Sequence, residues 1–243
     1  MKVWYLDHSA VAVKTEKHLL LFDLAGKALS GQPGEGLAEG CVNPDEIKDE
    51  DVLVFVSHEH KDHFDPAIFS LREKLSRVRF VLPEELDEVY QADLFVSAEE
   101  EQCKHYALPD CHITTFASTD IGVAYLLETD GLRIYHAGDL NWWHWEEEDD
   151  AYNRMMRGDY QKEIETLTGE KIDLAFVVLD PRQEEQFYWG FDWYMRHTDT
   201  KIVFPMHMWK QYEVQDRLIG MEVSEPYREK IMRIREKGQV FEL

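Results

Sequence analysis

The densest group of residues with ligand chemistry is the run Ser57-His58-Glu59-His60-Lys61-Asp62-His63. Side chains two positions apart in an extended loop point the same way, so His58 and His60 can grip one ion. Asp62 and His63 then offer a carboxylate and an imidazole to a second position. These ligand types suit zinc, manganese or iron. The alternative is a solvated histidine-rich turn, which we disfavour because four ligand-type residues in six positions follow a buried strand.

Other polar residues also occur where apolar segments end. The pairs of segment and following residue are Val52–Val56 with His58, Leu132–Tyr135 with Asp139, Ile172–Leu179 with Asp180, and Ile202–Met206 with His207. Strands of one sheet that end on the same side bring such tips together and leave a cleft in which loops supply the working groups. The sequence therefore predicts that residues far apart along the chain form one site.

Segment patterns predict a strand-rich chain. Strands are expected at Lys2–Leu6, Ala10–Lys14, Leu19–Asp23, Val52–Val56, Arg79–Leu82, His112–Phe116, Val123–Glu128, Leu132–Tyr135, Ile172–Leu179, Lys201–Met206 and Gln239–Glu242. Helices are expected at Pro66–Ser76, Ala151–Leu167 and Glu225–Glu236. Strand-rich halves with interspersed helices indicate an α+β fold with two packed sheets and helices outside.

Composition limits the partners. The chain has 243 residues, 44% of them apolar, which is enough for a full core and fits a single domain over residues 1–243. Its 26 Lys+Arg and 49 Asp+Glu give a formal charge of −23. That charge disfavours a nucleic acid or an anionic membrane as a partner, because both require a positive face.

Targeting and redox signals favour a cytoplasmic protein. Residues 1–13 carry Asp7 and His8 and lack a long apolar run, so we expect no signal peptide. The longest apolar runs are far short of the roughly 20 residues that a membrane span requires. The three cysteines are an odd number without metal-site spacing, which indicates a reducing compartment.

The His-x-His-x-Asp-His run resembles the motif of the metallo-β-lactamase superfamily. The resemblance extends over the early strands ending at Asp23, the His58–His63 run, Gly138-Asp139 and the late His207. Within the superfamily the chain is similar to the branch of ascorbate-6-phosphate lactonase and related metal-dependent hydrolases. The resemblance implies a four-layer αβ/βα sandwich with two β-sheets and outer helices, and it does not identify the substrate.

The resemblance also implies a ligand set. His58 and His60 match the pair that holds the first metal, and Asp62 and His63 match ligands of the second. Asp139 matches the carboxylate that bridges the two ions, and His207 matches the late histidine of the second site. The implied cofactor is therefore one or two divalent ions, with zinc favoured over manganese or iron.

One ligand of that pattern is absent from this sequence. Members of the superfamily usually carry a further histidine for the first metal, but the corresponding stretch here is Ala117-Ser118-Thr119-Asp120. We expect the second position to be better occupied than the first. The first is then weak, filled only with substrate, or completed by Ser118, Asp120 or a distant histidine, of which His8 is the strongest candidate.

Further residues are candidates for lining the site. Asp180 follows a buried strand and could orient a ligand histidine, and Arg182 could clamp a substrate carboxylate or phosphate through its planar fork. A plain salt bridge between surface loops is the alternative for this pair. Tryptophans after Asp139 and His207 would form an apolar wall, or else a core or homo-oligomer contact.

These observations favour a hydrolase in which a metal-bound hydroxide attacks a small ester, a lactone or a phosphorylated metabolite. Asp62 would both touch the metal and orient the water. Two alternatives remain: a nuclease of the same fold, and a metal-binding scaffold with little catalysis because one histidine is missing. The acidic charge argues against the nuclease.

Overall fold

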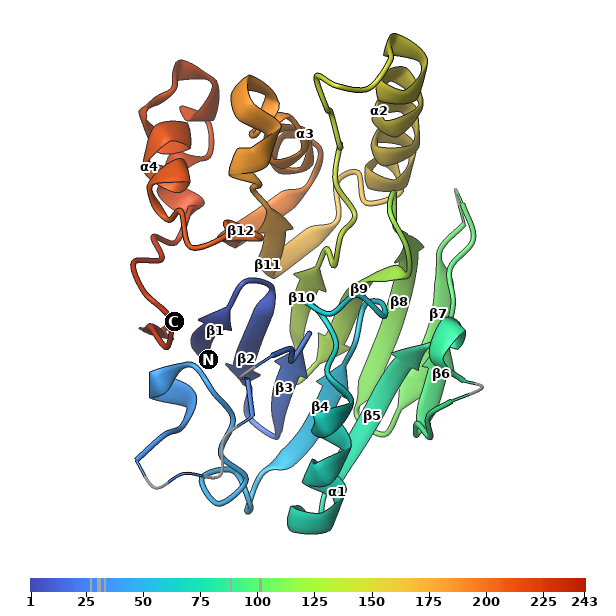
Figure 1. The fold of residues 1–243 in the computed structure, drawn as a ribbon, viewed down its shortest axis with the longest axis vertical. Coiled ribbons are helices and arrows are strands. Elements are labelled where there is room, and N and C mark those ends of the chain that lie inside the picture. Colours follow the sequence, from blue (N-terminus) through green and yellow to red (C-terminus); the bar gives the residue numbers. More distant parts are fainter. Residues whose placement is uncertain (27, 30–31, 33, 88, 101) are drawn as a thin grey trace. The chain divides into compact units, whose positions relative to one another are not determined.

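The computed structural model describes residues 1–243 except 27, 30–31, 33, 88 and 101. It divides into two compact units, one formed by Met1–Val96 with Arg235–Leu243 and the other by Ser97–Ile234. Each unit contains its own β-sheet (Figure 1). No helix in the described part of the chain is long and apolar enough to cross a membrane. The single domain over residues 1–243 stays a prediction.

The first unit is built on a seven-stranded mixed sheet in the order β13-β1-β2-β3-β4-β5-β6. Its strands and α-helix are β1 Lys2–Asp7, β2 Ala10–Lys14, β3 His18–Phe22, β4 Asp51–Phe55, β5 Val78–Pro83, β6 Leu94–Val96, β13 Val240–Glu242 and α1 Leu71–Lys74. Strands β1, β2 and β3 are antiparallel neighbours, whereas β3 to β6 run parallel.

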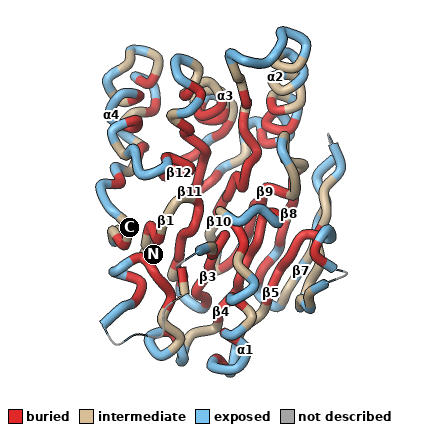
Figure 2. The backbone as a smooth tube through the Cα atoms, in the orientation of Figure 1, coloured by how far each residue is buried: buried red, intermediate tan, exposed pale blue. Residues whose placement is uncertain are grey.

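The parallel part of this sheet forms the core of the first unit. Leu19 and Leu21 of β3 and Val52 and Val54 of β4 are buried in one hydrophobic cluster, which also contains Leu71 of α1. Strands that are covered on both faces read as continuous apolar runs, and this explains the uninterrupted sequences of β3 and β4. Figure 2 shows the central strands as buried.

The second unit contains a six-stranded sheet in the order β12-β11-β10-β9-β8-β7. Its elements are β7 Lys104–Leu108, β8 Cys111–Ala117, β9 Val123–Thr129, β10 Leu132–His136, β11 Lys171–Val178, β12 Asp199–Met206, α2 Asp150–Glu165, α3 Trp189–His197 and α4 Glu213–Gly220. Strands β7 to β10 are antiparallel neighbours, and β10, β11 and β12 are parallel. Parallel strands end at the same edge, so the loops after β10, β11 and β12 share one end of this sheet.

Two mixed sheets with helices confirm the predicted α+β class. The predicted strands all occur, with ends shifted by a few residues, and so does the long helix α2. The helix predicted over Pro66–Ser76 forms as a 3₁₀ turn, Pro66–Ser70, followed by α1. Four elements were not predicted: β6, β7, α3 and α4.

The helix predicted over Glu225–Glu236 is wrong. Only the 3₁₀ turn Arg228–Lys230 forms there. Met232 N–H donates to Val203 O of β12 at 2.8 Å, and Ile234 N–H donates to Gln215 Oε1 at 2.8 Å. Bonds to other elements thus replace the intrahelical bonds.

In the second unit, α3 packs closely against the loop that follows β10. Gln183, in the 3₁₀ segment Pro181–Gln186 before α3, holds this loop in place. Asn141 Nδ2 donates to Gln183 Oε1 at 2.8 Å, and Gln183 Nε2 donates to Trp142 O at 2.9 Å. A Cβ atom on Gly190 would lie 2.1 Å from Asn141 Oδ1 and 3.0 Å from Trp142 N. Glycine is therefore required at this position by the close approach of helix and loop.

We predict that Gly190→Ala destabilises the protein by about 1–3 kcal/mol, the usual cost of overpacking a tight contact. Urea unfolding measures the free energy. Gly158→Ala is the matched control, because Gly158 lies within α2 and its added Cβ meets nothing within 4 Å. This control should be neutral or stabilising by about 0.4–1 kcal/mol. Equal effects of the two substitutions would contradict the packing described here.

Candidate metal centre

The loop after β4 gathers three imidazoles of the first unit. The ring centroids of His58 and His63 lie 4.1 Å apart, and those of His58 and His60 lie 4.7 Å apart. His58 and His63 are fully buried, whereas His60 is exposed. Ligand atoms of His58 and His60 lie within 4.8 Å of each other. Imidazole nitrogens this close together could coordinate a cation.

A buried carboxylate, Asp23, organises this loop from the end of β3. Ser57 donates to it twice, from its backbone N–H at 2.7 Å and from Oγ at 2.8 Å. His63 Nδ1 lies 2.8 Å from Asp23 Oδ2, and His58 Nδ1 lies 2.9 Å from Ser57 Oγ. Both imidazoles therefore use Nδ1 for hydrogen bonding, and this tautomer puts the ligating lone pair on Nε2.

Sequence reasoning gave no role to Asp23 or Ser57. Asp23 ends the apolar run Leu19–Phe22 in the same way that Asp139 and Asp180 follow their strands, and this was the available signal. The backbone of Asp23 is left-handed, with φ of 46°, a conformation that costs a non-glycine residue energy. The neighbouring β4 loop holds Asp23 in that conformation through the two bonds from Ser57.

His8 lies beside Asp62, in the turn between β1 and β2. His8 Nε2 is 3.4 Å from Asp62 Oδ2, and the ligand atoms of His8, Asp62 and His63 lie within 4.8 Å of one another. A hydrogen bond from His8 holds the pKa of Asp62 well below its ordinary value, against the opposing effect of burial. The structure thus groups His8 with the second pair of the motif rather than with His58 and His60.

In the second unit, Asp139 and His207 come together at the shared end of β10 and β12. His207 Nε2 lies 3.4 Å from Asp139 Oδ1, and both side chains are buried. His207 Nδ1 lies 2.9 Å from Asp180 Oδ2, so the same tautomer is set as in His63. The backbone of His207 is left-handed, with φ of 64°. A strained residue between two buried carboxylates is typical of a functional position.

Asp180 connects His207 to an arginine. Arg182 Nε lies 3.0 Å and 2.9 Å from the two Asp180 oxygens, and its Nη2 lies 2.5 Å from Oδ2. Trp209 Nε1 donates to the same oxygen at 3.3 Å. Although burial alone would raise it, the pKa of Asp180 is lowered by the hydrogen bonds from His207 and Arg182. Asp180 is therefore a buried anion with cationic or donor groups around it.

The stretch that lacks the usual histidine lies next to the Asp139 loop. Thr119 Oγ1 donates to Asn141 O at 2.6 Å and accepts from Asn141 N at 3.1 Å. Asp120 is exposed, and its N–H donates to Ser118 Oγ at 3.1 Å. The hydroxyl of Thr119 therefore anchors the Ser118–Asp120 turn against the loop that carries Asp139.

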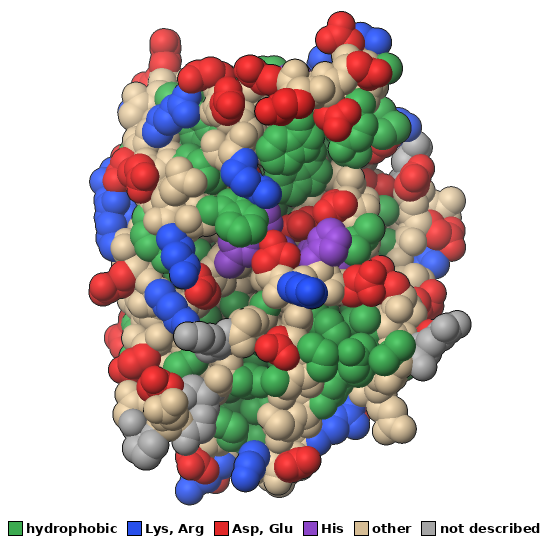
Figure 3. All heavy atoms as spheres, viewed as in Figure 1, with side chains coloured by type: hydrophobic (Ala, Val, Ile, Leu, Met, Phe, Trp, Pro, Cys, Tyr) green, Lys and Arg blue, Asp and Glu red, His purple; other side chains and the backbone are tan. Residues whose placement is uncertain are grey.

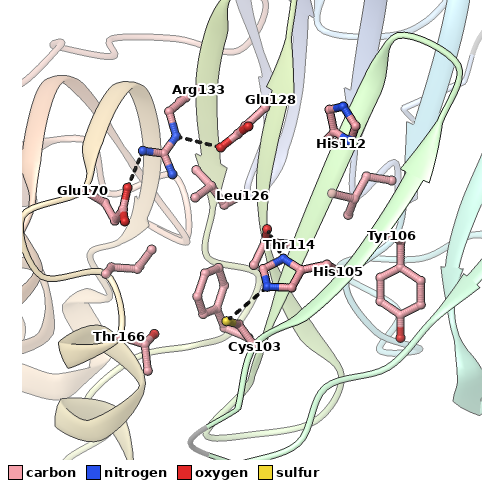
Figure 4. A pocket seen from close by; sticks show the side chains of 13 residues that line it. Cys103, His105, Tyr106, His112, Thr114, Leu126, Glu128, Arg133, Thr166 and Glu170 are labelled. Carbon is pink, nitrogen blue, oxygen red and sulfur yellow. Dashed lines mark hydrogen bonds and ion pairs between the residues drawn. The ribbon is translucent and has the colours of Figure 1, made fainter.

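The second unit also contains a cavity of about 440 Å³ along strands β7 to β10. Figure 4 shows Arg133 between Glu128 and Glu170, and His105 between Cys103 and Thr114. The candidate ligands Asp139 and His207 are not among its lining residues. Arg133 is held by carboxylates on two sides, so this cavity offers a neutralised guanidinium rather than an open one.

The donor set fits a divalent cation. It consists of imidazoles and carboxylates, and the buried imidazoles are held by hydrogen bonds at Nδ1. Such ligands suit zinc, manganese and iron, and the outer hydrogen bonds that orient ligand histidines are a regular feature of protein metal sites.

Sequence comparison finds a similarity to a protein named a metal-dependent hydrolase. No model of a protein family matches the chain. The UPF0173 metal-dependent hydrolase of Bacillus velezensis is 29% identical over 156 residues, which make up 57% of this chain and 63% of that relative. The match thus spans less than two thirds of the relative's length.

Comparison with solved structures shows the fold. The metallo-β-lactamase fold protein YhfI of Bacillus subtilis matches with a TM-score of 0.60 and 13% identity, over 99% of each chain. The metallo hydrolase Igni18 of Ignicoccus hospitalis matches with a TM-score of 0.63 and 19% identity, over 100% of this chain and 98% of its own. CmlA, a diiron β-hydroxylase of Streptomyces venezuelae, matches with a TM-score of 0.66 and 12% identity, over 100% of this chain and 54% of its own. This chain has the metallo-β-lactamase fold.

We predict that Asp23→Asn weakens zinc binding by about 10–100-fold, because the amide no longer fixes the His63 tautomer. Competition with a chromophoric chelator measures the affinity. Asp51→Asn is the matched control: Asp51 starts β4, the strand next to β3, and pairs with Arg79 at 2.8 Å. It should leave zinc affinity within about twofold of the parent, since an ion pair of this kind contributes little. Equal zinc affinity in the Asp23 variant and the parent would contradict the assigned role.

Proposed function

We propose that this protein is a metal-dependent hydrolase. The observation that carries the proposal is the pair of buried aspartate–histidine hydrogen bonds, Asp23 with His63 and Asp180 with His207. A fully buried carboxylate destabilises the folded protein unless it is paired with hydrogen-bond donors. Here the donor is an imidazole, and this geometry suits the orientation of that imidazole towards a cation. The hydrolase named in the sequence comparison supports the same activity.

In this proposal six residues are the ligands of one or two divalent ions: His58, His60, Asp62, His63, Asp139 and His207. A bound divalent cation would supply Lewis acidity and lower the pKa of a water molecule that it contacts. Asp62 is the proposed catalytic residue. Its ionised carboxylate can accept a hydrogen bond from the attacking water and orient it.

The finer parts of the proposal concern metal and substrate. We favour zinc, with the second position filled more tightly than the first, and a lactonase-like reaction on a small ester, lactone or phosphorylated metabolite. Acidic side chains are scattered over the face drawn in Figure 3, and with the charge of −23 they support a small substrate over a nucleic acid. The cysteines Cys41, Cys103 and Cys111 are free, which supports a cytoplasmic location.

We predict that Asp62→Asn lowers kcat/KM by about 10²–10⁴-fold, the usual contribution of a group that orients or deprotonates water. The assay is a panel of esters, lactones and phosphomonoesters with zinc, manganese or iron. Asp65→Asn is the control, since Asp65 caps the next turn by accepting from Ala67 N at 2.9 Å and is three residues away. It should retain the parent activity.

The same panel separates the alternatives. Loss of turnover on chelation and its return with metal would support the hydrolase. Absence of turnover on every substrate with every metal would favour the scaffold. Cleavage of single-stranded RNA that depends on Asp62, without turnover of small substrates, would favour the nuclease.

A further inference from the structure

Arg182 occupies an unusual position among the aromatic side chains of the second unit. Its guanidinium carbon lies 4.5 Å from the ring centroid of Trp209 and 5.6 Å from that of Trp145. The side chain remains 46% exposed, whereas its partner Asp180 is fully buried. Indole faces on a guanidinium fix its plane and leave its edges available for hydrogen bonding.

In the part of the chain that the structure describes, one edge of that guanidinium is used, by Asp180. An arginine carries five N–H donors, and Asp180 takes those on Nε and one on Nη2. Among the described residues, none accepts a hydrogen bond from Nη1 of Arg182. Three donors are thus left, two on Nη1 and one on Nη2, and one from each nitrogen faces the edge that can bind a carboxylate or a phosphate in bidentate fashion.

Two other arginines of this unit, Arg133 and Arg196, differ from Arg182. Arg133 has carboxylates on two sides, from Glu128 and Glu170. Arg196 binds Asp192 through Nε and the Val223 carbonyl through Nη2. Arg182 therefore combines a fixed plane, partial exposure and an unused edge.

The position of Arg182 connects it to the candidate metal ligands. Asp180, its partner, also binds His207, whose other nitrogen faces Asp139. The buried Trp143 stacks on Trp145 at 5.7 Å and 9°, and it contacts His207 edge-on at 5.7 Å. Arg182 itself thus lies one side chain, Asp180, away from the candidate metal ligand His207.

We propose that Arg182 recognises an acidic group of the substrate, a carboxylate or a phosphate, and thereby selects anionic substrates. This inference rests on the proposed hydrolase function, since it places the recognised group beside the same site. The tryptophans hold the guanidinium in plane, Asp180 orders it, and the free edge binds the oxyanion. In a chain of charge −23, a fixed cation of this kind offsets the general repulsion of anions.

The binding test uses no metal and no turnover. The parent protein is titrated with inorganic phosphate and with succinate, followed by calorimetry and by tryptophan fluorescence, to which Trp145 and Trp209 contribute. Arg182→Gln should weaken binding of the preferred anion by at least about 10-fold, the value of a hydrogen bond to a charged group. The preferred anion, phosphate or succinate, identifies which acidic group is recognised.

Arg154→Gln is the matched control, because Arg154 on α2 is exposed and its removal changes the net charge equally. It should change anion affinity by less than about twofold. Arg182→Lys keeps the charge without the planar fork and should recover only part of the affinity. Absence of saturable binding by the parent, or equal affinities in the parent and the folded Arg182→Gln variant, would overturn the inference.

A kinetic measurement separates this inference from the proposed function. Matched lactones with and without a phosphate or carboxylate group are compared in the parent and in Arg182→Gln. We expect KM to rise by at least about 10-fold for the anionic lactone only, with kcat less affected. Turnover that shows no preference for the anionic lactone would defeat the role of Arg182 while leaving the hydrolase intact. Anion binding at Arg182 without turnover of any lactone would support the role of Arg182 and contradict the hydrolase function.

Discussion

Much of this protein's chemistry depends on one interaction that occurs twice, a hydrogen bond from a histidine Nδ1 to a carboxylate removed from water. In the first unit the pair is His63 with Asp23, and in the second it is His207 with Asp180. Each carboxylate follows a buried parallel strand and belongs to the core rather than to the surface. A carboxylate in such a place is stabilised only by its donors, so the donors and the carboxylate hold one another in position.

The two buried carboxylates, Asp23 and Asp180, are stabilised by different hydrogen-bond donors. Ser57 donates two hydrogen bonds to Asp23, so the strand end itself neutralises part of the buried charge. Asp180 instead receives an arginine and an indole N–H. The first arrangement is closed to solvent, whereas the second has one half-exposed member. Because Arg182 is half-exposed, it is the member of the second arrangement that we propose to bind the substrate.

The sequence predicted most of the strands, apart from β6 and β7, and the loops with ligand-type residues that follow them, because apolar runs and ligand-type residues are local signals. It did not predict that Asp23 and Ser57 act together, because their contact depends on the pairing of β3 with β4 across 34 residues. The helix α3 was missed because its aromatic residues were interpreted as a wall, although Trp189 and Trp193 are four apart as a helix requires. The helix predicted at residues 225–236 does not form, because the backbone N–H groups of this segment donate to distant elements instead of to one another.

The sharing of Asp180 between His207 and Arg182 has an evolutionary consequence. A mutation of Arg182 that changes which ligand it binds also changes the charges around His207. In the proposed roles, anion recognition by Arg182 and cation binding by His207 therefore cannot change independently during evolution. Descendants of this chain that acquire new specificities should therefore show compensating changes at position 180 or 209, or else carry the variation on neighbouring loops that leave this trio intact.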